Sequence, residues 1–89
     1  MTRTDEELLT SIEEGLKDPI IRTNLFLRSA RRLYELVGDE ESVVRLDERQ
    51  AAEPNRVILA QFSPGTLRQL VRRARERCLM KLQTTEENK

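Results

Sequence analysis

Residues that start and stop helices divide this chain into stretches whose apolar side chains recur every three or four positions. This pattern constrains the fold more than any other feature. Thr4 and Glu7 have the spacing of a capping box. The apolar residues behind this box are Leu8, Leu9, Ile12 and Leu16. We therefore predict a first helix over about residues 5–16, which ends near Gly15 and Pro19.

The second stretch has a broad apolar surface. Pro19 suits the first turn of a helix with Asp18 as its cap, and Gly38 suits the left-handed position that closes it. The apolar residues cover an arc of roughly 200° at 100° per residue, which is wider than a one-sided surface helix needs. We predict a central helix that ends at residue 37, with part of this arc facing a second subunit. Its core face is predicted to include the two aromatic residues Phe26 and Tyr34.

The middle of the chain admits two interpretations. The stretch "DEESVVRLDERQAAE" begins with a cap and first-turn acids, and the chain reaches a proline at Pro54. This favours a third helix over about 40–52. The alternative is a β-hairpin at 43–62 that pairs "VVRL" with "RVILAQF", because both are rich in β-branched residues.

The last helix begins at "SPGT", where Ser63 can cap it and Pro64 occupies its first position. We predict that it runs to about residue 82 and that the polar segment 83–89 is a disordered tail. The expected fold class is mainly α, a small bundle of four or five helices in one domain over 1–82. The class becomes α+β if the hairpin forms.

The composition excludes most catalytic sites. The chain has no histidine and one cysteine, so a histidine-based triad and the usual zinc ligand sets cannot be assembled. The paired acids Glu6–Glu7 and Glu13–Glu14 are expected to be solvated rather than buried. We expect a protein that is not an enzyme and that holds no cofactor and no metal.

The chain has no apolar run long enough for a membrane span, and its first residues are acidic where a secretory signal is basic. The single Cys78 cannot form an internal disulfide and is expected to be a buried, inert thiol. We therefore expect a cytoplasmic protein without membrane association.

A net charge of zero hides alternating charged segments. Residues 1–18 carry two basic and six acidic side chains, and residues 19–37 carry four and one. Residues 38–53 again carry two and six, whereas residues 54–82 carry seven and one. The basic side chains are therefore concentrated on the last predicted helix.

On that helix one face is apolar and the other is basic. The apolar residues are Leu67, Leu70, Val71, Ala74, Cys78 and Leu82. The opposite face carries Arg68, Gln69, Arg72, Arg73 and Glu76, with Arg75 and Arg77 at its borders. An α-helix fits the major groove of duplex DNA, arginines bind phosphates and guanine edges, and a helix N-terminus offers free N–H groups to a phosphate.

The stretch "SPGTLRQLVRRARER" resembles the recognition helix of the helix-turn-helix in the fourth conserved region of bacterial sigma factors and in related response-regulator output domains. The matching positions are Ser63, Gly65, Thr66 and the run Arg73–Ala74–Arg75. The resemblance covers about residues 55–78 and makes 40–82 a helix-turn-helix-like unit behind an N-terminal helical pair at 5–37. It implies that "PNRVILAQF" is the supporting helix. Gln61 and Val57 stand where the family usually has glycine and alanine.

The resemblance implies a set of DNA-binding residues: Ser63, Thr66, Arg68, Gln69, Arg72, Arg73 and Arg75. We accordingly expect a small, non-catalytic DNA-binding protein that regulates transcription. The alternative is a helical protein–protein interaction or assembly module whose basic helix docks on an acidic partner. Leu79 and Met80 point away from the apolar face of the last helix, which favours a homodimer.

Overall fold

The structure is a computed structural model that describes residues 2–18, 20 and 23–87. Its elements in chain order are α1 (Arg3–Leu16), β1 (Asn24–Phe26), α2 (Leu27–Val37), α3 (Glu40–Ala52), β2 (Leu59–Gln61) and α4 (Pro64–Glu87). The predicted mainly helical fold is confirmed, with four helices and one small antiparallel sheet in the described residues.

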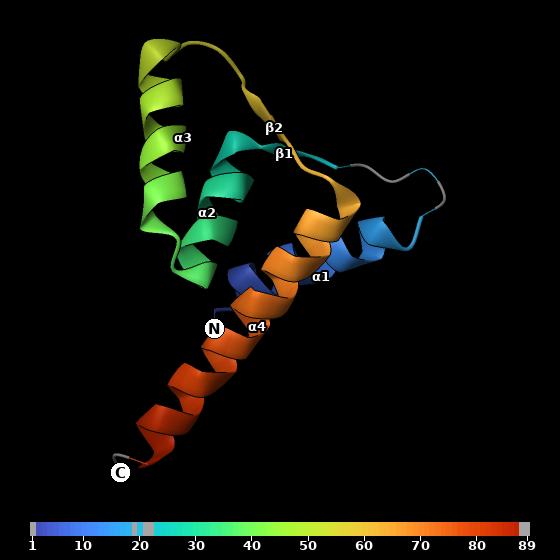
Figure 1. The fold of residues 1–89 in the computed structure, drawn as a ribbon, viewed down its shortest axis with the longest axis vertical. Helices are drawn as coiled ribbons and strands as arrows, with labels where there is room; N and C mark the ends of the chain where they lie inside the picture. Colours follow the sequence, from blue (N-terminus) through green and yellow to red (C-terminus); the bar gives the residue numbers. More distant parts are fainter. Residues whose placement is uncertain (1, 19, 21–22, 88–89) are drawn as a thin grey trace.

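Figure 1 shows how these elements are arranged. α2 and α3 lie side by side and run in opposite directions, while α4 packs against both α1 and α2. The C-terminal half of α4 extends away from the other elements. The helix continues through Glu87, into the segment 83–89 that is expected to be a disordered tail.

α1 begins two residues earlier than predicted. The Thr2 hydroxyl oxygen accepts a hydrogen bond from the backbone N–H of Asp5 at 3.1 Å, so Thr2 is the cap. The predicted capping box of Thr4 and Glu7 is therefore wrong. Both candidate caps are threonines with an acid three residues later, so the pattern alone did not distinguish them.

The start of the second predicted helix is also wrong, because residues 24–26 form strand β1 and α2 begins only at Leu27. The Leu27 N–H donates to the Ile58 carbonyl and the Phe62 N–H donates to the Thr23 carbonyl, both at 3.0 Å. This pairing with a distant segment replaces helical hydrogen bonds. Pro19, predicted in the first turn of that helix, lies outside the described residues. The predicted end is confirmed, since Gly38 closes α2 with a φ of 78°.

The prediction that Phe26 lies on the core face is wrong, because Phe26 is the exposed last residue of β1. Tyr34 does pack beside the core, with its ring centroid 5.9 Å from that of Phe62.

α3 confirms the predicted helix over 40–52. The Asp39 carboxylate caps it by accepting hydrogen bonds from the Ser42 N–H at 3.2 Å and the Ser42 hydroxyl at 2.7 Å. The alternative hairpin at 43–62 is wrong, because β2 pairs with β1 and not with the "VVRL" segment. The supporting helix implied for "PNRVILAQF" is wrong as well, since residues 59–61 of that segment are a strand.

The core has two parts. The larger cluster joins α1, α2 and α4 and contains the buried residues Leu9, Ile12, Leu33, Leu36, Leu67, Leu70, Val71 and Ala74. The smaller cluster joins α2 to the strands through Leu27, Ala30, Ile58 and Ala60. The thiol-bearing Cys78 is half-buried beside the larger cluster. α2 contributes to both parts, which confirms its central position.

A buried ion pair joins α1 to α2. Asp5 is only 4% exposed, and its two carboxylate oxygens accept hydrogen bonds of 2.7 Å from Nε and Nη2 of Arg32. These hydrogen bonds lower the pKa of Asp5 from its ordinary value of 3.8 to about 2, although burial opposes the shift.

This pair predicts an acid-sensitive contribution to stability. Because the folded-state pKa of Asp5 is lowered, its contribution is present above about pH 4 and is lost as the pH falls through about 2. Arg32 is partly exposed to solvent, so we expect a loss on the order of 1–2 kcal/mol. Urea unfolding of the natural chain and of Asp5→Asn, followed by circular dichroism between pH 2 and 7, measures it. The stability difference between the two proteins should shrink as the pH falls. A constant difference would contradict the assignment.

Candidate nucleic-acid interface on α4

α4 is held to the molecule by one face and exposes the other. Leu67, Leu70, Val71 and Ala74 are buried against α1 and α2, which confirms the predicted apolar face over these residues. Arg68, Gln69, Arg72 and Arg73 are all exposed. The side chains of Met80 and Leu82 lie outside the described residues. We call the exposed residues Arg68, Gln69, Arg72 and Arg73 the basic face.

The start of α4 is fixed by Ser63 and Thr66. The Ser63 hydroxyl oxygen accepts a hydrogen bond from the Thr66 N–H at 3.2 Å, and the Ser63 hydroxyl donates to Thr66 Oγ1 at 2.7 Å. Pro64 occupies the first helical position, as predicted. These two members of the predicted DNA-binding set are thus placed at the cap, one turn before the basic face.

Arg75 lies apart from the other predicted site residues. Its guanidinium turns toward α1, where Nε donates to Glu13 Oε1 at 3.1 Å and Nη1 donates to Glu6 Oε1 at 2.9 Å. Its Nη2 also contacts Glu13, and these hydrogen bonds raise the pKa of Arg75. Arg75 therefore fastens α4 to α1. Glu6 and Glu13 are seven residues apart, or about two turns of α1, so both lie on the side of α1 that faces Arg75.

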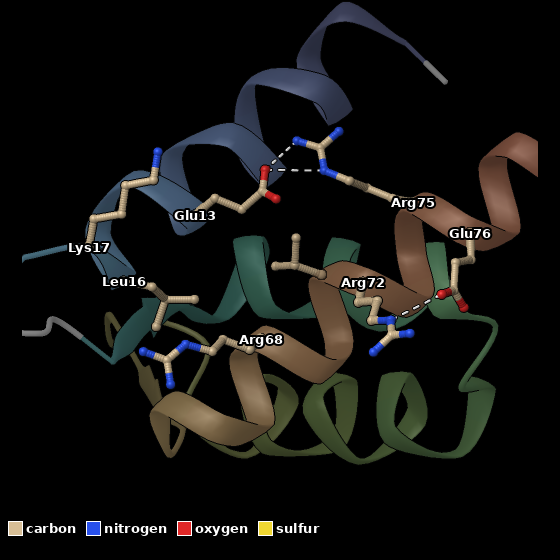
Figure 2. A pocket seen from close by; sticks show the side chains of 8 residues that line it. Glu13, Leu16, Lys17, Arg68, Arg72, Arg75 and Glu76 are labelled. Carbon is tan, nitrogen blue, oxygen red and sulfur yellow. Dashed lines mark hydrogen bonds and ion pairs between the residues drawn. The ribbon is translucent and has the colours of Figure 1, made fainter.

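A pocket of about 450 Å³ lies between α1 and α4. Leu16, Lys17 and Arg68 lie at one end of it, and Figure 2 shows Arg72 bonded to Glu76 across its edge. The Arg72 Nε to Glu76 Oε1 distance is 3.1 Å, with both side chains largely exposed. Arg68 makes no ion pair with any residue of the described ranges. Lys17, which the sequence pattern did not single out, also lies beside the basic face, where its Nζ is paired with Glu14 at 3.5 Å.

The other edge of α4 lies beside the turn between α2 and α3. Hydrogen bonds from Ser42 lower the pKa of Asp39, and the charges of Arg45 and Arg73 lower it further. The Arg77 guanidinium lies against Gly38, in the space that a side chain on Gly38 would occupy. Arg77 therefore covers the C-terminal end of α2, where a cation is favourable.

The arginines of α2 are mostly engaged within the fold. Arg31 donates to both oxygens of Asp47 on α3, at 2.7 and 3.2 Å, and to Glu35 at 2.9 Å. With Arg32 bound to Asp5, two of the basic residues of this segment hold helices together. On the basic face, Arg68 and Arg73 form no ion pair within the residues that the structure describes, so they remain available for a ligand.

No protein-family model matches this chain, and neither a curated protein nor a solved structure matches it. These comparisons therefore do not test the resemblance to the sigma-factor and response-regulator helix-turn-helix; the recognition helix stays a prediction, whereas the supporting helix is replaced by β2. In the described part of the chain no helix is long and apolar enough to cross a membrane.

Proposed function

We propose that this chain is a small, non-catalytic protein that binds duplex DNA with the basic face of α4. The observation that carries the proposal is the chemistry of the exposed surface of α4. Between residues 65 and 77, every exposed residue is glycine or polar, and four of them are arginines: Arg68, Arg72, Arg73 and Arg77. The single acid among them is Glu76.

Such a surface suits phosphate better than protein. Interfaces between proteins have an apolar centre in which charged residues are depleted, whereas surfaces that bind DNA are more polar and strongly positive. The Arg72–Glu76 pair is exposed, and pairs of this kind contribute only about 0.3–0.5 kcal/mol. A phosphate can therefore replace Glu76 as the partner of Arg72.

The proposed contacts divide by role. Arg68, Arg72 and Arg73 neutralise phosphates and supply affinity. Gln69 has the amide needed to pair with an adenine edge in the major groove, and we assign base contacts to Thr66 and Arg68 as well. Ser63 positions the first turn of the helix, and Arg75 acts through α1 rather than on DNA.

A role in transcription, a homodimeric state and a cytoplasmic location complete the proposal. A second copy would double the number of phosphates that one assembly contacts. The exposed Leu79 on the projecting part of α4 supports a contact between copies.

The alternative is a protein module that docks on an acidic partner through the same face. Fluorescence anisotropy of a labelled mixed-sequence DNA duplex at low salt separates the two, with polyglutamate of equal charge measured beside it. We expect micromolar binding of the duplex and markedly weaker binding of polyglutamate. Tighter binding of polyglutamate would favour the alternative, and absence of duplex binding would overturn the proposal.

A further inference from the structure

The two-stranded sheet has an exposed apolar face. Phe26 on β1 is paired in register with Leu59 on β2, and they are 62% and 46% exposed. Val57 precedes Leu59 by two residues and is 76% exposed. The neighbouring residues Ile58 and Ala60 are buried and point to the other face of the sheet. Phe26, Val57 and Leu59, which we call the ribbon patch, are thus apolar surface that the described fold leaves uncovered.

The edge of this sheet along β2 is available for backbone pairing. Hydrogen bonds join residue 27 to residue 58 and residue 62 to residue 23. Antiparallel strands alternate between hydrogen-bonded and non-hydrogen-bonded pairs, so the Phe26–Leu59 pair is of the second kind. The backbone N–H and C=O groups of Leu59 therefore point outward, away from the other strand, whereas Phe26 is the N-cap of α2 and its C=O belongs to the first turn of that helix. An exposed edge of this kind is a template for another strand.

Arginines lie around the ribbon patch, and one of them, Arg56, is paired with Glu53 at 2.9 Å. A hollow of about 570 Å³ beside Phe26 and Val57 includes Arg28 and Arg56 in its lining. A second hollow is lined by Asn24, Arg49, Leu59 and Gln61. Neither lining contains an aspartate or a glutamate. Arg28 and Arg49 form no ion pair within the described parts of the chain, although most arginines of α2 and α3 do.

We infer that the ribbon patch binds an extended segment of a partner protein with apolar side chains at its centre and acidic side chains at both ends. The segment pairs its backbone with the free edge at Leu59, places its central apolar side chains on the face of the ribbon patch, and directs the carboxylates at its ends to Arg28 and Arg49. Apolar contacts at the centre with arginines around them are the composition of a protein interface. This surface is separate from the basic face of α4 and does not depend on the proposed DNA binding.

Two other occupants fit less well. A second copy of this chain placed symmetrically on the patch would bring the arginines of both copies together, and like charges oppose such a contact. Single-stranded nucleic acid would match the arginines, but its bases need aromatic platforms, and Phe26 is the one aromatic residue of the patch.

Titration of a fluorescent nine-residue peptide with valines at its centre and glutamates at both ends into the full chain tests the inference. We expect binding that weakens about tenfold or more in Phe26→Ala and in Arg28→Glu/Arg49→Glu. A peptide with lysine in place of glutamate should bind the charge-reversed variant and not the natural chain. All substituted residues are exposed, and circular dichroism checks that the variants fold.

A control variant distinguishes peptide binding at the ribbon patch from peptide binding at α4. Replacing Arg68, Arg72 and Arg73 by glutamine should leave the affinity for the valine–glutamate peptide within about twofold. Loss of peptide binding in that variant would overturn the inference, because the peptide would then be bound by α4. It would also be overturned if the natural chain does not bind the peptide, if charge reversal has no effect, or if single-stranded DNA binds the patch more tightly.

Discussion

Replacing Leu33 by alanine should lower the free energy of unfolding by about 2–5 kcal/mol. Leu33 is fully buried at the centre of α2 and belongs to the cluster that joins α1, α2 and α4. The substitution removes apolar contacts and leaves a cavity that three helices would have to close. A chain of 89 residues is expected to be stable by only roughly 4–13 kcal/mol, so this loss is a large part of the total.

Urea unfolding followed by far-ultraviolet circular dichroism measures the effect, since the chain has no tryptophan. Val44→Ala on α3 is the matched control, because Val44 is 53% exposed. We expect this control to change stability by no more than about 0.5 kcal/mol. Equal effects of the two substitutions would contradict the position of α2 at the centre of the core.

Replacing Arg68, Arg72 and Arg73 together by glutamine should nearly abolish DNA binding. If each arginine releases about one counterion from the duplex, each contributes roughly tenfold in affinity at 50 mM salt. The triple variant should then bind on the order of 10³-fold more weakly. All three side chains are exposed, so the fold should be retained. Anisotropy with a labelled duplex measures the change.

Arg75→Gln is the matched control for the triple variant, since it removes a positive charge from the same helix. The Arg75 guanidinium is bonded to Glu6 and Glu13, so its loss should weaken the attachment of α4 to α1. DNA affinity should fall by no more than a few fold, which is the effect expected from the loss of one positive charge on the protein. If Arg75→Gln reduced binding as much as the triple variant does, net charge and not the basic face would be responsible.

Elements that carry their own local signals could be predicted from the sequence. Three helix ends were predictable because each is capped by hydrogen bonds between residues that are close in the sequence. The capping residues are Asp39 before α3, Gly38 after α2 and Ser63 before α4. The apolar face of α4 was also predictable, because helical spacing determines which of its residues are buried together.

The strands could not be predicted in the same way. Leu25 and Phe26 fit the helical spacing of the α2 segment, and only pairing with residues 59–61 makes them a strand. That pairing is a contact between segments far apart in the chain, which propensity does not describe. The same contact removed the supporting helix of the predicted helix-turn-helix and left Phe26 exposed.

The candidate site was predicted in part. Composition did not distinguish Arg75 from Arg72 and Arg73, because all three are arginines in one basic run. The distinction comes from packing, which places α1 beside one edge of α4 and directs Arg75 to Glu13. The sequence shows that the first segment is acidic and the last segment is basic. It does not show which arginine of α4 the acids of α1 bind, because that depends on how the two helices are aligned.

The salt dependence of DNA binding tests the central claim most directly. Anisotropy titrations of one duplex at several salt concentrations give the slope of log affinity against log salt, for the natural chain and for the Arg68/Arg72/Arg73 variant. If the basic face of α4 contacts phosphates, the natural chain should bind with a steep slope. The variant should lose about two to three units of that slope, or about 0.9 for each arginine. Equal slopes for the two proteins, or a natural chain that does not bind the duplex even at low salt, would contradict it.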